Sequence, residues 1–260
     1  MAARLTALVT GGASGLGRAT ALNLAARGMG VVVADINETD FEDSNIRFAQ
    51  TDVTSEADVG RALDLARAEF GSTPFVAVNC AGIGYAKRTM SSKGVPHDLE
   101  GFSRVMNVNA VGTFNVLRLA AMRMVETDAD EDGQRGVIIN TASIAAYEGQ
   151  ARQLPPFRFL LVGQAAYAAS KGAIVAMTLP CARDLAASGI RVCAIAPGLF
   201  RTPLLEGLPE LVRTQLASTV PNPPRLGQAE EFAHLVASIV DNNMLNGEVI
   251  RLDGALRMGP

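Results

Sequence analysis

A short apolar segment that runs into a glycine-rich loop and then into a helical pattern most restricts the fold of this chain. Residues 5–10 (LTALVT) have the composition of a buried strand, and GGASGLG follows directly, before RATALNLAARG. Gly11, Gly15 and Gly17 form a GxxxGxG pattern. Such glycines let the backbone approach a pyrophosphate, whose charge the amino terminus of the helix favours. The loop alone is weak evidence for a nucleotide site, because any tight turn from strand to helix favours glycine.

The second apolar segment, residues 30–35 (GVVVAD), strengthens the nucleotide interpretation. It ends at Asp35, 18 residues past Gly17. A carboxylate at this place accepts hydrogen bonds from the adenosine ribose hydroxyls and repels a 2′-phosphate, so we expect NAD rather than NADP. Arg18 is close enough in sequence to leave a phosphate-binding alternative open. A simple turn-forming role is the alternative for Asp35.

The rest of the chain continues this alternation of strands and helices. We expect strands at 46–53, 75–82, 136–143, 189–198 and 247–254. Helices are expected after Thr54 or Ser55, from about 100 to 125, from near Tyr167 and over 227–242. Residues 1–260 are therefore predicted to form a single α/β domain. Its fold would be a Rossmann-like, doubly wound parallel sheet with helices on both faces and ligands beyond the carboxyl ends of the strands.

Prolines and asparagines mark three places where this pattern is unusual. Pro180 should bend or end the helix that begins near Tyr167. Residues 199–225 contain five prolines and an amphipathic segment, which predicts a substrate lid over a cleft. Asn107 and Asn109 lie inside the 100–125 helix, where asparagine is unfavourable. We interpret Asn107 as a solvated residue without a role.

Composition narrows the class of function. The chain has 260 residues, of which 48% are hydrophobic and 19% charged, and its net charge is −3. These values are typical of a globular protein and carry no signature of nucleic-acid binding, so a small-molecule substrate is expected. No apolar run approaches the roughly 18 residues of a membrane span, and we expect a cytoplasmic protein. Three cysteines and two histidines show no ligand spacing, so no metal site is expected.

Tyr167 and Lys171 form the strongest catalytic signal. They lie four residues apart in GQAAYAASKGAIVAM, a spacing that puts both on one face of a helix. An ammonium near a phenol favours the phenolate, so a group with a reference pKa of about 10 would exchange a proton nearer neutrality. An ordinary helical pair is the alternative. The chain has few tyrosines and lysines, and chance produces this spacing in only about 3% of such chains.

Together these motifs resemble the short-chain dehydrogenase/reductase family over nearly the whole chain. The resemblance rests on TGGASGLG, Asp35, TDV, NCAG, the VN of Asn109, the serine of NTAS, YAASK, and APG followed by Thr202. Four longer segments look most like the branch of short-chain 3-hydroxyacyl-CoA dehydrogenases, also called type 10 17β-hydroxysteroid dehydrogenases: INTASIAAYEGQ, GQAAYAASKGAIVAMTLPCARDLA, IRVCAIAPGLFRTPLL and LNGEVIRLDGALRM. That branch uses NAD, in agreement with Asp35.

The resemblance implies an oxidoreductase that transfers a hydride between a secondary alcohol and nicotinamide. Tyr167 would be the base in alcohol oxidation, and Lys171 would hold the nicotinamide ribose and lower the pKa of Tyr167. Ser143 would hydrogen-bond the substrate oxygen, and Asn109 would anchor a water molecule between Lys171 and solvent. The substrate contacts would be Ser143 and Tyr167. The cofactor contacts would be Gly11, Ser14, Gly15, Leu16, Gly17, Asp35, Asp52, Val53, Asn79, Cys80, Ala81, Gly82, Tyr167, Lys171, Pro197, Gly198, Phe200 and Thr202.

One segment departs from the family pattern. The catalytic serine usually precedes the tyrosine by about a dozen residues, whereas Ser143 and Tyr167 are 24 apart, which predicts an insertion at 151–161. We expect a loop that bulges outward, and three alternatives stay open for it: it walls the acyl or sterol pocket, it packs on a neighbouring subunit, or it is disordered. Two alternatives stay open: an NADP-dependent 3-ketoacyl reductase and a non-catalytic cofactor-binding scaffold. The family also suggests a homotetramer.

Overall fold

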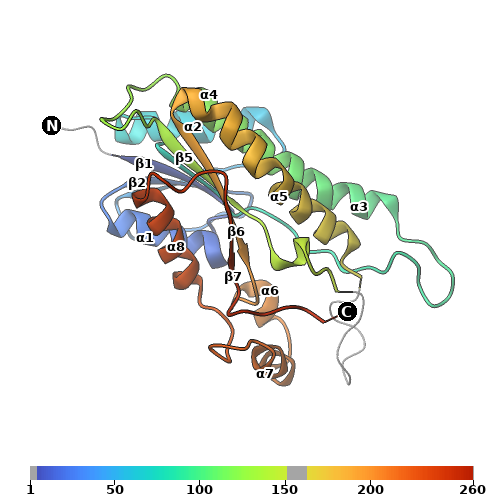
Figure 1. The fold of residues 1–260 in the computed structure, drawn as a ribbon. Helices are drawn as coiled ribbons and strands as arrows, with labels where there is room; N and C mark the ends of the chain where they lie inside the picture. The colour runs from blue at the N-terminus through green and yellow to red at the C-terminus, as the bar shows by residue number, and fades with distance from the viewer. Residues whose placement is uncertain (1–4, 151–162, 260) are drawn as a thin grey trace.

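A single parallel sheet organises the chain. The computed structural model describes residues 5–150 and 163–259. Within these residues seven strands follow the order β3-β2-β1-β4-β5-β6-β7, each paired in parallel with its neighbours (Figure 1). The strands are β1 (Thr6–Thr10), β2 (Gly30–Asp35), β3 (Ile46–Gln50), β4 (Val76–Asn79), β5 (Gly136–Thr141), β6 (Ile190–Pro197) and β7 (Val249–Leu252).

Helices cover both faces of this sheet. Leu24 of α1 and Phe232 of α8 pack into one core cluster, while Leu63 of α2, Met124 of α4 and Ala182 of α5 pack into another (Figure 1). The predicted doubly wound α/β fold is therefore confirmed. The helices are α1 (Gly15–Ala26), α2 (Glu56–Phe70), α3 (Leu99–Met106), α4 (Thr113–Met124), α5 (Ala165–Leu185), α6 (Pro203–Glu206), α7 (Glu210–Ser218) and α8 (Ala229–Asp241).

The order of the strands places the ligand crevice. β1 lies between β2 and β4, so the chain winds outward from β1 in one direction and from β4 in the other. At such a reversal the loops after two adjacent strands separate, and a crevice opens beyond their carboxyl ends. The loops concerned begin at Gly11 after β1 and at Cys80 after β4.

The helix expected over 100–125 is interrupted at its centre. α3 and α4 are joined by η1 (Asn107–Gly112), a π-helical segment. Asn107 is exposed, as interpreted, whereas Asn109 is completely buried. A π-helical turn re-aims side chains within a helix and is frequent at functional sites. The unfavourable asparagine therefore marks a local change of helix type.

Pro180 is predicted to bend or end the helix, and the prediction that the helix ends there is wrong. α5 continues through Pro180 to Leu185. Proline removes one backbone hydrogen bond, but α5 packs along β6, so tertiary contacts offset that loss. Several strands are shorter than expected. The third ends at Gln50 rather than at Asp52, and Ser55 is the residue that caps the helix after it.

Two other segments frame the ligand edge of the sheet. The expected lid, 199–225, contains α6 and α7, which lie together at one end of the molecule (Figure 1). The predicted insertion at 151–161 lies outside the described residues. Within the part of the chain that the structure describes, no helix has the length and apolar character that crossing a membrane requires.

Candidate active site

The glycine loop after β1 is shaped by contacts that exclude side chains. Gly11 has φ 64°, and a Cβ there would lie 2.6 Å from the amide nitrogen of Ala81. A Cβ on Gly17 would overlap the carbonyl oxygen of Gly11. Both its positive φ and the short distance to Ala81 require glycine at position 11. Glycine at position 17 lets α1 begin this close to the loop. The amino terminus of α1 is thereby held at the crevice.

That amino terminus is suited to an anion. Ser14 is the N-cap residue, but its side chain makes no capping hydrogen bond, and the first turn of α1 contains no acidic residue. The first backbone N–H groups of a helix have no intrahelical acceptor and carry a partial positive charge. Ser14, Gly15, Leu16 and Gly17 all border the crevice. This geometry fits the pyrophosphate of a dinucleotide.

A cleft of about 450 Å³ runs along this edge from the glycine loop to the end of β3. Asp35 lies in it, where Oδ2 accepts a hydrogen bond from the Ala13 amide and Oδ1 one from the Asn37 amide, both at 3.0 Å. The carboxylate is thus fixed beside the glycine loop. Besides Ser14 and Leu16, the cleft brings together most of the predicted cofactor residues: Gly11, Gly15, Gly17, Asp35, Asp52, Val53, Cys80, Ala81, Gly82 and Thr202.

Arg18 is directed to another partner. Its guanidinium donates to Thr39 Oγ1 at 2.9 Å and to the Asp40 carbonyl at 3.3 Å, and it lies 4.3 Å from the centre of the Phe41 ring. Arg18 is not among the described residues that line the cleft. The phosphate-binding alternative would therefore require Arg18 to leave these contacts.

α5 brings Tyr167 and Lys171 to one face, as their spacing predicts. Lys171 Nζ lies 5.9 Å from the centre of the Tyr167 ring. Lys171 is only 4% exposed, and its ammonium donates to the Thr141 carbonyl at 2.6 Å. Burial lowers the pKa of Lys171 to about 8. A side chain with this pKa is still mostly charged at neutral pH.

Ser143 lies against Tyr167 despite the 24 residues between them. Ser143 Oγ accepts a hydrogen bond from the Ala145 amide at 3.1 Å and caps the short 3-10 turn η2 (Ile144–Ala146). Ser143 and Tyr167 line one cavity. Burial raises the pKa of Tyr167, while a hydrogen bond from the Ser143 hydroxyl opposes that rise. The pKa shift of Tyr167 is thus opposite to the one expected from Lys171, since the buried phenol loses more solvation than these contacts return.

Asn109 joins three elements behind the site. Its Nδ2 donates to the Ile83 carbonyl and to Ser170 Oγ, each at 3.0 Å, and its Oδ1 accepts from the Ile83 amide at 2.8 Å. A Cβ on Gly82 would lie 3.2 Å from Asn109 Oδ1 and 3.6 Å from Lys171 Nζ. The two polar groups therefore face a common space that the missing side chain of Gly82 leaves open.

A second, apolar cavity of about 190 Å³ adjoins the cleft, because Leu16 and Thr202 line both. Ser143 and Tyr167 form its polar part. Its walls also contain Pro197, Gly198 and Phe200, which were predicted as cofactor contacts, and residues that sequence reasoning did not identify. The latter include Tyr85, Ile144, Gln164 and Met258, whereas Leu199 and Leu205 come from the predicted lid. Nothing in the sequence indicated that these residues meet.

Asn79 has a different environment from the one predicted. It is 2% exposed; its Nδ2 donates to Asn140 Oδ1 at 2.9 Å, and its Oδ1 accepts from Thr10 Oγ1 at 3.3 Å. The side chain thus connects three strands below the cleft. Asn79, Asn109 and Lys171 line neither cavity. In the described residues no group of three or more histidine, cysteine, aspartate or glutamate side chains is arranged to hold a metal ion.

The fold and the two adjoining cavities are typical of a nucleotide-dependent oxidoreductase. The family model described as short chain dehydrogenase matches residues 5–211. The chain belongs to the short-chain dehydrogenase family and is an oxidoreductase that acts on CH–OH groups.

Proteins that are similar to this chain are named as dehydrogenases or reductases of 3-hydroxyacyl or 3-ketoacyl compounds. The 3-hydroxyacyl-CoA dehydrogenase type-2 of Bos taurus is 57% identical, over 98% of this chain and 96% of that protein. A crystal structure of 3-hydroxyacyl-CoA dehydrogenase type-2 from Mycobacterium avium is 39% identical with a TM-score of 0.89, and covers 98% of this chain and 97% of that one. A 3-ketoacyl-(acyl-carrier-protein) reductase from Brucella melitensis, complexed with NADH, is 28% identical with a TM-score of 0.82, and covers 98% of both chains.

Proposed function

We propose that this protein oxidises a secondary alcohol to a ketone with NAD, and that its substrate is a 3-hydroxyacyl-CoA. The observation that carries the proposal is the junction of the two cavities. Ser143 and Tyr167 stand in an apolar pocket that shares Leu16 and Thr202 with the nucleotide cleft. A substrate in that pocket would present its alcohol to both hydroxyls beside the cofactor.

The residues of the glycine loop and Asp35 would hold NAD in the cleft, and bound NAD would supply the acceptor for the hydride of the alcohol carbon. Tyr167 Oη takes the hydroxyl proton, so the C–H pair leaves as hydride while the new C=O bond forms. Ser143 would donate its one hydroxyl proton to the substrate oxygen during the reaction. Lys171 holds a positive charge near Tyr167 and would contact the nicotinamide ribose of the bound cofactor. The space that Asn109 and Lys171 share at Gly82 suits a water molecule that relays the proton to solvent.

The choice of NAD over NADP is supported by Asp35 and Arg18. The Asp35 carboxylate would repel a 2′-phosphate, and Arg18 is bonded to Thr39 and Asp40. The related reductase from Brucella melitensis was crystallised with NADH, a cofactor that has no 2′-phosphate. Affinities for NADH and NADPH, measured by fluorescence titration, decide the matter. Tighter binding of NADPH would instead favour the NADP-dependent 3-ketoacyl reductase.

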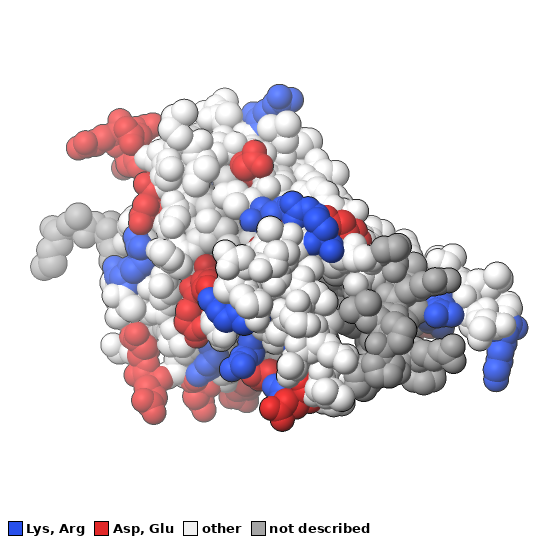
Figure 2. All heavy atoms as spheres, turned by 60° about the horizontal axis from the view of Figure 1, so that its bottom comes forward, with Lys and Arg blue, Asp and Glu red and all other residues white. Residues whose placement is uncertain are grey.

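An acyl-CoA substrate is supported by the relatives and by charge at the pocket. Figure 2 shows positive charge on the projection at the right, where Figure 1 places the loop between β4 and α3. This loop contains Lys87, and the exposed Arg88 and Lys93. Tyr85 and Ala86, at its start, line the apolar pocket. Lys87 is paired with Asp98, so Arg88 and Lys93 are the basic side chains of this loop that we propose for the phosphates of CoA. A hydroxysteroid would use the pocket alone.

The deciding experiment is a substrate panel. Purified, folded protein loaded with NAD is offered 3-hydroxyacyl-CoA, a 17β-hydroxysteroid and simple secondary alcohols, and NADH formation is followed at 340 nm. We expect the acyl-CoA to be oxidised fastest. Tyr167→Phe should abolish turnover and keep NADH affinity. Cofactor binding without turnover of any alcohol would favour the non-catalytic scaffold, and unchanged activity in Tyr167→Phe would refute the catalytic assignment.

The segment 199–225 is proposed as the lid of the pocket. Leu199, Phe200, Thr202 and Leu205 all come from it and line the apolar cavity. If this segment closed over a bound substrate, it would exclude water from the space in which the hydride is transferred. Protection of residues 199–225 from limited proteolysis by NADH and ketone together would support this role.

A homotetramer is proposed from an exposed apolar face on α4 and α5. Phe114, Met122 and Leu179 are each more than 40% exposed, and Phe114 and Met122 border a shallow groove with Leu117 and Leu185. A second copy of this chain, which presents the same face, would cover it and form a dimer, and we propose that the last strand, at the edge of the sheet, joins two such dimers. Light scattering after gel filtration should give the mass of four chains, and a monomeric mass would contradict the proposal. A cytoplasmic location agrees with the three free cysteines, and cell fractionation tests it.

A further inference from the structure

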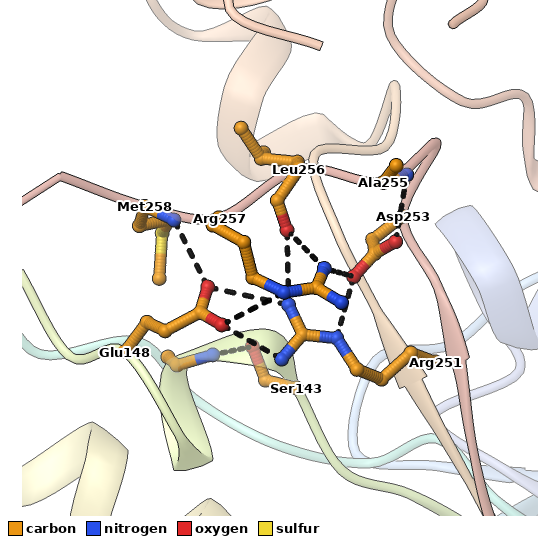
Figure 3. Close-up of polar contacts among 9 residues, drawn as sticks. Ser143, Glu148, Arg251, Asp253, Ala255, Leu256, Arg257 and Met258 are labelled. Atoms are coloured by element: carbon orange, nitrogen blue, oxygen red, sulfur yellow. Dashed lines mark hydrogen bonds and ion pairs between the residues drawn. The ribbon is translucent and has the colours of Figure 1, made fainter. Parts of the chain in front are cut away.

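Four charged side chains form a cluster beside the pocket, and we call Glu148, Arg251, Asp253 and Arg257 the C-terminal latch (Figure 3). Arg251 donates from Nη1 to Glu148 Oε1 at 2.8 Å, from Nη2 to Glu148 Oε2 at 3.2 Å and from Nε to Asp253 Oδ2 at 2.7 Å. Its Nη2 also donates to the Leu256 carbonyl at 2.9 Å. Arg257 bonds Asp253 Oδ2 at 3.1 Å and lies 3.5 Å from Glu148.

The centre of the latch is shielded from water. The side chains of Arg251, Glu148 and Asp253 are 21%, 19% and 6% exposed. The two carboxylates balance the two guanidinium groups, so no unpaired charge is buried. A fork-shaped pair between arginine and a carboxylate fixes the relative orientation of its partners more strictly than a single contact. Removal of one partner would leave the others buried and uncompensated.

Glu148 connects the latch to Ser143 through one hydrogen-bonded turn. The Ala146 amide donates to the Ser143 carbonyl at 3.0 Å, and the Glu148 amide donates to the Ile144 carbonyl at 3.0 Å. Figure 3 shows Ser143 at the base of this turn, below the Glu148 carboxylate. The position of the carboxylate and the position of the Ser143 hydroxyl are therefore linked through η2.

The other side of the latch holds the end of the chain in an unusual conformation. Ala255 has φ 66°, although it is not glycine, and its amide donates to Asp253 Oδ1 at 3.0 Å. A non-glycine residue in this region is strained and persists only where its surroundings determine it. The Met258 amide then donates to Glu148 Oε2 at 2.9 Å. Glu148 therefore fixes both the serine turn and the backbone at Met258.

Apolar contacts also join the turn after Ser143 to residues 256–258. Leu256, 4% exposed, packs with Ile144 and Val220, and Met258 is packed against this cluster. Met258 and Ile144 both line the apolar cavity that holds Ser143 and Tyr167. The latch thus positions one catalytic hydroxyl and one wall of the pocket together, although Ser143 and Met258 are far apart in sequence.

We propose that Glu148 and Arg251 are positioning residues that hold Ser143 and residues 253–258 in fixed positions relative to each other. We also propose that Met258 determines which acyl chains the pocket accepts. The role of Met258 rests on the acyl-CoA function proposed above. The coupling between the two segments does not, because it is a property of the folded chain.

The coupling is tested first by hydrogen exchange, without any substrate. Glu148→Gln and Arg251→Met should accelerate amide exchange in both 143–148 and 253–259. Glu69→Gln is the matched control, since Glu69 pairs with Arg47 at 2.8 Å on β3, at the opposite edge of the sheet. It should change neither segment. Faster exchange in only one of the two segments, or in neither, would overturn the coupling. If Arg251→Met does not fold, Arg251→Lys replaces it, because it keeps the charge and loses the fork.

Kinetic measurements then distinguish a positioning role of Glu148 and Arg251 from a role in stability alone. Glu148→Gln should lower kcat about tenfold to a hundredfold, as expected when a reacting group is misplaced, and leave the NADH dissociation constant unchanged. The double variant with Arg251→Met should be no slower than the slower single variant, since both remove one connection. Glu69→Gln should retain the wild-type kcat. Wild-type kcat in Glu148→Gln, or multiplicative losses in the double variant, would refute positioning.

The role of Met258 is tested with 3-hydroxyacyl-CoA substrates of increasing chain length. Met258→Ala should shift the optimum of kcat/KM to longer chains and Met258→Phe to shorter ones, both with unchanged NADH affinity. Unchanged chain-length profiles in both variants would refute the role of Met258. A wild-type enzyme that oxidises none of these substrates would refute the acyl-CoA function and with it the chain-length role, while the exchange result would still decide the coupling.

Discussion

The ammonium of Lys171 donates to the carbonyl oxygen of Thr141 at 2.6 Å, in a place where Lys171 is only 4% exposed. Thr141 ends β5, so this bond ties the catalytic face of α5 to the edge of the sheet from which Ser143 follows. The lysine is thereby held near Tyr167 at the cost of burying its charge. Burial lowers its pKa to about 8, which has a measurable consequence for stability.

We predict that Lys171→Met changes how stability depends on pH between about 8 and 10.5. Lys171 has a pKa of 10.5 when unfolded and about 8 when folded, so the unfolded chain binds more protons within this window. The free energy of unfolding of the wild type should therefore gain about 3 kcal/mol from this residue as pH rises through the window. Urea unfolding at several pH values measures it, and Lys171→Met should lack this gain.

Other groups titrate in the same range, so the comparison needs a matched control. Lys93→Met removes an exposed lysine from the loop before α3. The difference between this variant and the wild type should not vary with pH in the window. An equally pH-independent difference for Lys171→Met would mean that the buried amine keeps its ordinary pKa.

Features that depend on neighbouring residues in the chain were accessible from the sequence. The order of strand, glycine loop and helix is local, and so is the spacing of Tyr167 and Lys171. The carboxyl end of a buried strand likewise identifies Asp35 without knowledge of the fold. Each of these is a period or a turn requirement that a few adjacent residues determine. The fold class follows from the same alternation.

Features that depend on distant partners were not accessible. The meeting of Glu148 with Arg251 crosses 103 residues and leaves no periodic trace. The continuation of α5 through Pro180 and the π-helical turn at Asn109 both depend on tertiary contacts that outweigh local preference. The direction of the Tyr167 pKa was mistaken for a similar reason. Spacing reveals a nearby ammonium but not the burial that opposes its effect.

Asp35→Asn should shift cofactor preference toward NADP. The substitution keeps a side chain of the same shape beside the Ala13 and Asn37 amides and removes the charge that would repel a 2′-phosphate. We expect the ratio of NADPH to NADH affinity to rise about tenfold or more, measured by fluorescence titration. Asp52→Asn is the control, since Asp52 is the second carboxylate of the same cleft and is held by Thr54 at 2.9 Å. An equal change in both variants would show that general cleft charge, not Asp35, sets the preference.

Asn109→Ala should destabilise the protein by about 2–4 kcal/mol. The substitution removes three hydrogen bonds of a completely buried side chain and leaves the Ile83 amide and carbonyl without their partner. The loop after β4 would loosen with it, so activity should fall even where the variant remains folded. Asn107→Ala changes an exposed residue of the same π-helical segment and should cost less than about 0.5 kcal/mol. Urea unfolding provides the comparison, and equal losses in the two variants would contradict the bridging role of Asn109.

Arg191→Met should cause a larger loss of stability, because one buried guanidinium terminates α8. Arg191 is 3% exposed and donates to the carbonyl oxygens of Ile239, Val240, Asn242 and Leu245 at 2.9 to 3.2 Å. The last carbonyls of a helix have no intrahelical donor, so methionine would leave those of Ile239 and Val240 in α8 without the donor that Arg191 supplies. It would also remove the donor to Asn242 and one of the two donors to Leu245, beyond the helix. We expect a loss of about 3–5 kcal/mol, comparable to breaking a buried charged contact. Arg61→Met, which removes an exposed arginine paired with Asp58, should cost less than about 1 kcal/mol. Urea midpoints that fall equally in the two variants would show that α8 ends stably without Arg191.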